Sequence, residues 1–172
     1  MLVRRETAAD VGSVAEVTTA AFGKDGEGEP VETRLLAELR RDAAWVPELS
    51  LVAVADDGRV IGHVVCTRAH SGSERAVGLG PISVRPEDQG QGVGSALMHA
   101  VLGAADAMGE PAVVLLGEPG YYSRFGFVLA SDHGITPPVP DWEPYFQVRP
   151  LAAWSPSLKG EFRYAEPFSR VS

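Results

Sequence analysis

The sequence has little cysteine and no long apolar run. Its single cysteine, Cys66, cannot form a disulfide within the chain and lies in an apolar stretch that is typical of a core strand. No apolar stretch is long enough for a membrane-spanning helix, and none follows the basic residues near the N-terminus as it would in a secretory signal. We therefore predict a soluble, cytoplasmic protein without a membrane partner.

Positive charge is also scarce. The chain has 15 Lys and Arg residues against 23 Asp and Glu residues, which gives a formal net charge of −8. Because nucleic-acid binding depends largely on basic side chains that neutralise phosphates, this balance argues against a nucleic-acid partner. An acidic protein is compatible with a cationic amine as its ligand.

The length of 172 residues, with 45% hydrophobic residues, fits one globular domain with a substantial core. We expect a single domain over residues 1–172, with its core over about 1–151 and a C-terminal segment, 152–172, packed on that core. No internal repeat or low-complexity segment is visible in the sequence.

Glycine, in contrast, is concentrated in one short stretch. Gly90, Gly92 and Gly94 occupy alternate positions between an apolar segment, residues 77–84, and a segment with helical periodicity, residues 92–108. Without Cβ atoms, such a turn lets backbone N–H groups approach an anion, and the helix start adds unpaired N–H groups and the positive end of its dipole. We predict that this stretch, the glycine turn (residues 89–95), binds phosphate.

The spacing of these glycines excludes two common phosphate-binding motifs. A dinucleotide fingerprint needs G-x-G-x-x-G, but the third residue after Gly92 is Ser95 and the third after Gly94 is Leu97. A Walker loop needs Gly-Lys-Ser/Thr, which is absent. The pattern that remains is Gln89-x-x-Gly92-x-Gly94.

A second motif follows about 30 residues later, after the predicted helix and an apolar strand. It is Tyr122-x-x-x-Gly126-Phe127. In this order, the two motifs resemble those of the GNAT superfamily of N-acetyltransferases, in which the first binds the pyrophosphate of coenzyme A. Further stretches, Leu79-Gly80-Pro81 and the tyrosine-rich run that begins at Gly120, are similar to the YhbS-like branch of that superfamily, as is the proline-rich C-terminal segment.

The resemblance implies an α/β (α+β) fold of the GNAT type. Its centre would be a mixed, mostly antiparallel sheet of about six to seven strands flanked by helices. Apolar periodicity and turn signals predict strands and helices at compatible places, whereas 69–76 is predicted to be a polar loop. The predicted strands are 2–5, 49–55, 60–67, 77–84, 112–116, 128–131, 146–151 and 160–164, and the predicted helices are 11–22, 31–41 and 92–108.

The resemblance also implies an activity, which is direct transfer of acetyl from acetyl-CoA to a primary amine of a small molecule or peptide (EC 2.3.1 type). No metal is predicted, and a homodimer is left open. An alternative is a non-catalytic acyl-CoA-binding or regulatory module with the same fold. By the resemblance, the residues that contact the coenzyme are Ile82, Ser83, Val84, Gln89, Gly90, Gln91, Gly92, Val93, Gly94, Ser95, Tyr122 and Arg124.

Two of these residues are assigned to the chemistry by the resemblance. The Ile82 N–H would lie near the thioester oxygen, and Tyr122 would act as the general acid. A phenol whose pKa is near 10 stays protonated at pH 7 and can donate its proton to the departing thiolate.

The strand before the glycine turn would contribute through its backbone. Gly80-Pro81 predicts a bend in it, and if the strand separates from residues 112–116, free backbone groups at Ile82 and Val84 could pair with pantetheine. Positive charge for the phosphates would come from Arg85, Arg124 or both.

The general base is not identified by the sequence, because residues 77–84 contain no acid or histidine, although many family members carry a glutamate there. A water-mediated proton transfer, or an acceptor that binds as a neutral amine, is an alternative. The candidate side chains are His70, Glu74, Glu27, Glu29 and His133.

Overall fold

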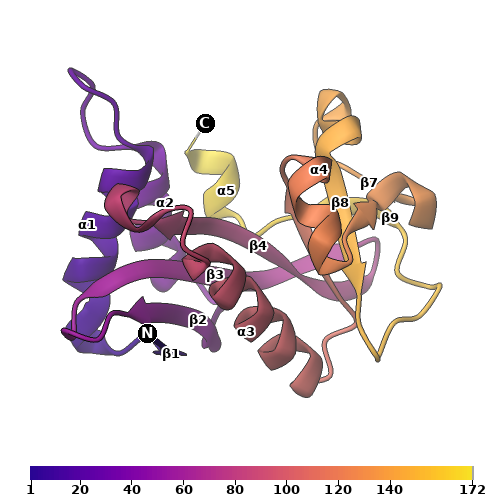
Figure 1. The fold of residues 1–172 in the computed structure, drawn as a ribbon. Helices are drawn as coiled ribbons and strands as arrows, with labels where there is room; N and C mark the ends of the chain where they lie inside the picture. Colours follow the sequence, from indigo (N-terminus) through magenta and orange to yellow (C-terminus); the bar gives the residue numbers. More distant parts are fainter. Residues whose placement is uncertain (172) are drawn as a thin grey trace.

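A mixed, mostly antiparallel sheet runs through the molecule, and helices cover both of its faces (Figure 1). The computed structural model describes residues 1–171, and the predicted fold class is confirmed. The sheet follows the path β1 (Leu2–Arg5), β2 (Trp45–Val54), β3 (Val60–Ser71), β4 (Glu74–Val84), β5 (Ala112–Leu116), β8 (Phe146–Pro150) and β6 (Val128–Leu129).

Two short strands extend this sheet beyond the predicted six to seven strands. Strand β9 (Gly160–Arg163) pairs with the end of β3, and β7 (Ile135–Thr136) pairs with β9. The α-helices within residues 1–171 are α1 (Val11–Phe22), α2 (Val31–Arg40), α3 (Val93–Ala107), α4 (Pro119–Tyr122) and α5 (Pro167–Arg170), and short 3-10 helices lie between several elements. None of them is long and apolar enough to cross a membrane.

The alternation of side chains along β2 shows how the two faces are covered. Leu51 and Ala53 belong to the core cluster under α3, whereas Val52, between them, packs with Val14 of α1 and Leu36 of α2. Successive strand residues point to opposite faces, so a run in which every residue is apolar can pack against α3 on one face and against α1 and α2 on the other.

The predicted polar loop at residues 69–76 is wrong, because β3 and β4 continue through it as a hairpin. The strands pair up to Ser71↔Glu74, and the two-residue turn between them begins at Gly72, whose φ of +57° favours glycine. Ala69 and Ala76 are buried. They place one face of the hairpin in the core although the segment is polar on average.

Strands β4 and β5 are parallel but pair over a very short distance. Their ladder consists of Val77↔Val113 and Gly78↔Val114. Beyond this point β4 stays paired with β3 and continues to Val84. The two strands therefore separate and leave a gap in the middle of the sheet.

A buried polar cluster ties the first strands to α2. Arg40 forms an ion pair with Glu6, whose carboxylate also accepts a hydrogen bond from Ser50, and the Ser50 hydroxyl lies 2.8 Å from His63 Nε2. Burial alone would raise the pKa of Glu6, but contacts with His63 and Ser50 and the charge of Arg40 lower it to about 2. Burial lowers the pKa of His63. Glu6 is therefore ionised and His63 neutral at pH 7.

Candidate active site

The backbone of β4 faces the gap at alternate residues. Arg85, just beyond β4, donates its N–H to the Ile61 carbonyl of β3 at 2.8 Å. Since backbone groups in an antiparallel pair point alternately toward and away from the partner, those of Ile82 and Val84 point away from β3, toward the side where β5 has separated. The Val84 carbonyl accepts a hydrogen bond from the Gln89 side chain at 3.0 Å, which agrees with this direction.

The glycine turn lines a cavity of about 400 Å³ at one end of the gap, which we call the turn cavity. Gly90 and Gly92 have φ of +75° and +87°, and Gly92 directly precedes α3. Open space surrounds the position that a Cβ would take at either residue. The predicted contacts that line the turn cavity are Val84, Gln89, Gly90, Gly92, Val93, Gly94, Ser95 and Arg124. Asp88 and Tyr121, which were not predicted as contacts, line it as well.

Of the two arginines considered for phosphate binding, one faces the turn cavity. Arg124 lies over the ring of Tyr121 with its guanidinium carbon 4.4 Å from the ring centroid, and its Nε donates to the Tyr121 carbonyl at 2.9 Å. Arg85 instead forms ion pairs with Asp88 at 2.6 Å and Glu87 at 2.7 Å, and it lines a different cavity. Arg124 therefore supplies the positive charge of the turn cavity.

Two predicted coenzyme contacts, Ser83 and Gln91, line neither this cavity nor the central cavity described below. Ser83 is buried on the α1 side of the sheet, with its hydroxyl 3.5 Å from that of Thr18. Gln91 is exposed and donates to the Glu87 carbonyl at 3.3 Å. The side chains of Ser83 and Gln91 therefore point away from the other predicted contacts.

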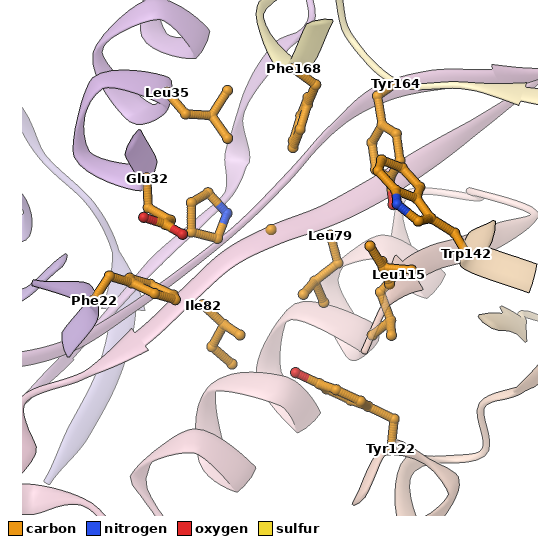
Figure 2. Close-up of a pocket in the computed structure, with 13 residues that line it drawn as sticks. Phe22, Glu32, Leu35, Leu79, Ile82, Leu115, Tyr122, Trp142, Tyr164 and Phe168 are labelled. Carbon is orange, nitrogen blue, oxygen red and sulfur yellow. The ribbon is translucent and has the colours of Figure 1, made fainter. Parts of the chain in front are cut away.

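A second cavity of about 400 Å³, the central cavity, lies farther along the gap (Figure 2). Its walls come from α1, α2, residues 79–82 of β4, the end of β5, α4, the 3-10 helix at Pro140–Tyr145 and the C-terminal segment. Ile82 and Tyr122 both line it. Since Val84 lines the turn cavity, the outer end of β4 connects the two cavities.

Tyr122, the predicted general acid, lines the central cavity. It ends the single turn of α4, and in Figure 2 its hydroxyl points into the cavity. Burial is the main cause that raises its pKa, with a smaller effect of Tyr121 beside it. The phenol is therefore protonated over the neutral pH range, as proton donation to a thiolate requires.

None of the five side chains considered as a general base lines the central cavity. His70 and Glu74 lie at the β3–β4 hairpin, and the His133 ring packs on Trp154 at 4.9 Å between centroids. The acid that does line the cavity is Glu32 of α2. A glutamate in the first turn after Pro30 is ordinary for a helix start, so no sequence signal marks Glu32 for another role.

The side chains of residues 1–171 favour neither catalysis by a cysteine nucleophile nor a metal centre. Burial raises the pKa of the Cys66 thiol, which keeps it protonated and removes it as a nucleophile. Over residues 1–171, no group of three or more His, Cys, Asp and Glu side chains is arranged to hold a metal ion.

Comparison with known proteins identifies the class to which this site belongs. The model of the Acetyltransferase (GNAT) family matches residues 16–127. The chain belongs to this family of acetyltransferases. The uncharacterized N-acetyltransferase YhbS of Escherichia coli (strain K12) is 35% identical to it over 173 residues, which cover 99% of both chains. The resemblance to the YhbS-like branch is confirmed.

Solved structures agree with this relationship. The structure of YhbS from Escherichia coli in complex with CoA has a TM-score of 0.89 at 34% identity, and the match covers 99% of this chain and 93% of that one. A GNAT family acetyltransferase from Brucella melitensis in complex with acetyl-CoA has a TM-score of 0.79 at 32% identity, with 97% of both chains covered.

Proposed function

We propose that this protein transfers the acetyl group of acetyl-CoA directly to a primary amine. The observation that carries the proposal is the gap between β4 and β5, because it joins the turn cavity, which the glycine turn lines, to a cavity that contains a protonated tyrosine. The relatives solved with CoA and acetyl-CoA support the choice of coenzyme.

The coenzyme would lie along this gap. Backbone N–H groups at Gly92 and Gly94, the start of α3 and the Arg124 guanidinium would bind its phosphates. The pantetheine amides would pair with the backbone of Ile82 and Val84, as an added strand pairs with an open sheet edge. This arrangement would bring the thioester into the central cavity.

The transfer step requires three groups. The neutral amine attacks the thioester carbonyl carbon, forming the C–N bond, and the oxygen becomes an oxyanion that the Ile82 N–H would stabilise. One good donor of this kind contributes about 3–4 kcal/mol. Once the C–N bond has formed, the nitrogen would release its extra proton to solvent. When the C–S bond breaks, the Tyr122 hydroxyl would donate a proton to the thiolate and would regain one from solvent.

Ligand-dependent stabilisation tests the coenzyme site first. At about a hundred times the dissociation constant, acetyl-CoA or CoA should add about 2.7 kcal/mol to the stability and raise the melting temperature by about 5–10 °C. NAD and ATP should not. Thiol release from acetyl-CoA on addition of amines then tests transfer. Tight acetyl-CoA binding without thiol release across a broad amine panel would favour the non-catalytic module instead.

Two predictions from the sequence remain predictions, namely the single domain over residues 1–172 and the cytoplasmic location. A homodimer is left open, as it was by the sequence. The C-terminal segment does contact the rest of the chain, because β9 pairs with β3 and Phe168 of α5 packs with Leu35 and Leu39 of α2.

A further inference from the structure

The central cavity has an apolar and largely aromatic wall. Phe22, Trp142, Tyr164 and Phe168 contribute rings to it, and Leu79 and Leu115 contribute aliphatic carbon. Figure 2 shows these side chains around a shared space above the Tyr122 hydroxyl. Such a wall favours a ligand with an apolar body, because burying that body removes apolar surface from water.

Part of this wall is held in place by its own packing. The Tyr164 ring lies 4.6 Å from that of Phe168 and 4.9 Å from that of Phe162, between centroids. A Cβ at Gly78 would come within 2.8 Å of the Tyr164 ring, so the ring rests directly on the β4 backbone. A wall that is preformed loses little conformational freedom when it binds a ligand.

One carboxylate breaks the apolar lining. Glu32 points from the first turn of α2 into the central cavity beside Phe22. No hydrogen bond or ion pair joins its carboxylate to another side chain of residues 1–171, whereas Glu38 on the same helix lies 3.6 Å from Arg170. An unpaired carboxylate at the edge of an apolar cavity attracts a ligand cation.

We propose that the acceptor is a primary amine carried on an aromatic or bulky apolar body, and that Glu32 holds its ammonium group. This inference rests on the proposed transferase function and specifies its substrate class. The apolar body packs against Trp142, Tyr164 and Phe168, and the ammonium group donates hydrogen bonds to the Glu32 carboxylate. Small polyamines, which are charged along their whole length, do not match this lining.

Glu32 also takes part in the transfer step. The ammonium group gives one proton to the Glu32 carboxylate, which becomes a carboxylic acid, and the amine lone pair is then free to form the C–N bond. After the C–N bond has formed, the nitrogen releases its second proton to solvent, and the proton held by Glu32 returns to solvent after the product leaves. An amine that is already neutral does not need this transfer.

Binding to the complex of the protein with CoA tests the acceptor class without turnover. By calorimetry at pH 7, 2-phenylethylamine should bind more tightly than putrescine, and n-hexylamine about fifteenfold more tightly than n-butylamine, at about fourfold for each buried methylene. Equal affinity for putrescine and 2-phenylethylamine would overturn the proposed acceptor class. A Trp142→Ala variant should weaken 2-phenylethylamine binding and leave acetyl-CoA binding intact.

A matched pair of amines tests Glu32. O-benzylhydroxylamine has nearly the shape of 2-phenylethylamine but is neutral at pH 7. Glu32→Gln should weaken 2-phenylethylamine binding about 10-fold to 100-fold, the usual effect of losing a hydrogen bond to a charged group, and change O-benzylhydroxylamine binding little. Glu38→Gln, on the same helix, should alter neither. Equal losses for both amines in Glu32→Gln would refute the charge contact.

Turnover separates this inference from the function on which it rests. Thiol release should be fastest with apolar amines, and kcat in Glu32→Gln should fall more for 2-phenylethylamine than for O-benzylhydroxylamine. If acetyl-CoA binds and only polyamines release thiol, the acceptor class is wrong and the transferase function stands. If acetyl-CoA binds and no amine releases thiol, the transferase function is wrong and the acceptor assignment is overturned with it.

Discussion

The ring of Tyr122 lies directly against the backbone of Gly117, where a Cβ would come within 2.4 Å of the tyrosine Cε2 atom. Gly117 follows β5, so the absence of a side chain there fixes how closely α4 packs on the end of that strand. The position of the proposed general acid therefore depends on a glycine outside both sequence motifs.

Gly117→Ala should displace the Tyr122 ring and lower kcat by at least tenfold, while the dissociation constant of acetyl-CoA changes little, because Gly117 lines neither cavity. Steady-state kinetics and calorimetry measure the two effects. Gly120→Ala is the matched control, because a Cβ at Gly120 meets nothing within 4 Å. An unchanged kcat in Gly117→Ala would show that this contact does not position the tyrosine.

Tyr122→Phe should lower kcat by about 10²-fold to 10⁴-fold, the range for loss of a general acid, and leave acetyl-CoA affinity intact. In the unmodified protein, kcat should not fall from Tyr122 ionisation below about pH 10, because burial raises the pKa of this phenol and the acid form is lost only above that value. A pH–rate profile from 6 to 10 checks this point. Tyr145→Phe, at an exposed tyrosine outside both cavities, should keep full activity.

Gly94→Ala should weaken coenzyme binding at least tenfold without destabilising the fold. The added Cβ would lie 3.6 Å from the Tyr121 hydroxyl, an ordinary contact, but inside the turn cavity. Alanine in place of a helical glycine adds about 0.5–1 kcal/mol of stability. A Cβ at Gly103, on the same helix, meets nothing within 4 Å. Gly103→Ala should therefore raise the stability by the same amount and leave coenzyme binding unchanged. Equal coenzyme affinity in the two variants would contradict phosphate binding at the turn.

Arg124→Gln should raise the dissociation constant of CoA about tenfold or more, since hydrogen bonds to charged groups contribute about 1.5–3 kcal/mol. The effect should shrink as salt is added, because Arg124 is exposed and its charge is screened. Calorimetry at low and high ionic strength measures both trends. A variant whose affinity and salt dependence match the unmodified protein would mean that Arg124 does not contact the phosphates.

Acid should destabilise the protein through Glu6. Its pKa is lowered to about 2 in the fold, so its contribution is fully present above its ordinary value of 4.5 and is lost as the pH falls toward about 2. At about 1.4 kcal/mol per pKa unit this contribution is of the order of 3 kcal/mol. The difference in unfolding free energy between the unmodified protein and Glu6→Gln, from urea titrations, should narrow between pH 5 and pH 3. If this difference in unfolding free energy is constant with pH, the lowered pKa of Glu6 is not a cause of the acid destabilisation.

The sequence predicted those parts of the site that are local in the chain. The glycine turn is a segment of seven residues that leads into the start of α3, so its conformation and its exposed N–H groups follow from the glycines themselves. Tyr122 was selected by its motif. The hairpin at residues 69–76 was missed because a polar average hid the alternation of buried Ala69 and Ala76.

The rest of the site could not be predicted, because it is assembled from distant segments. Glu32, Trp142 and Phe168 are far apart in the sequence and share no spacing that marks a site. Only the packing of α2, the 3-10 helix Pro140–Tyr145 and α5 around residues 79–82 of β4 brings them together. Loops and terminal segments specify the shape of a pocket only after folding.

The short ladder between β4 and β5 also has a mechanical consequence. Two residue pairs, Val77↔Val113 and Gly78↔Val114, are the whole hydrogen-bonded seam between the first four strands and the remainder of the central path. A bound coenzyme that pairs with β4 would add hydrogen bonds along this edge and would restrict the motion of the two parts of the sheet relative to each other. Amide hydrogen exchange at Ile82, Val84 and along β5 should therefore slow together when CoA binds. Because these added hydrogen bonds must break when CoA leaves, product release would be the step that requires the two parts of the sheet to move apart.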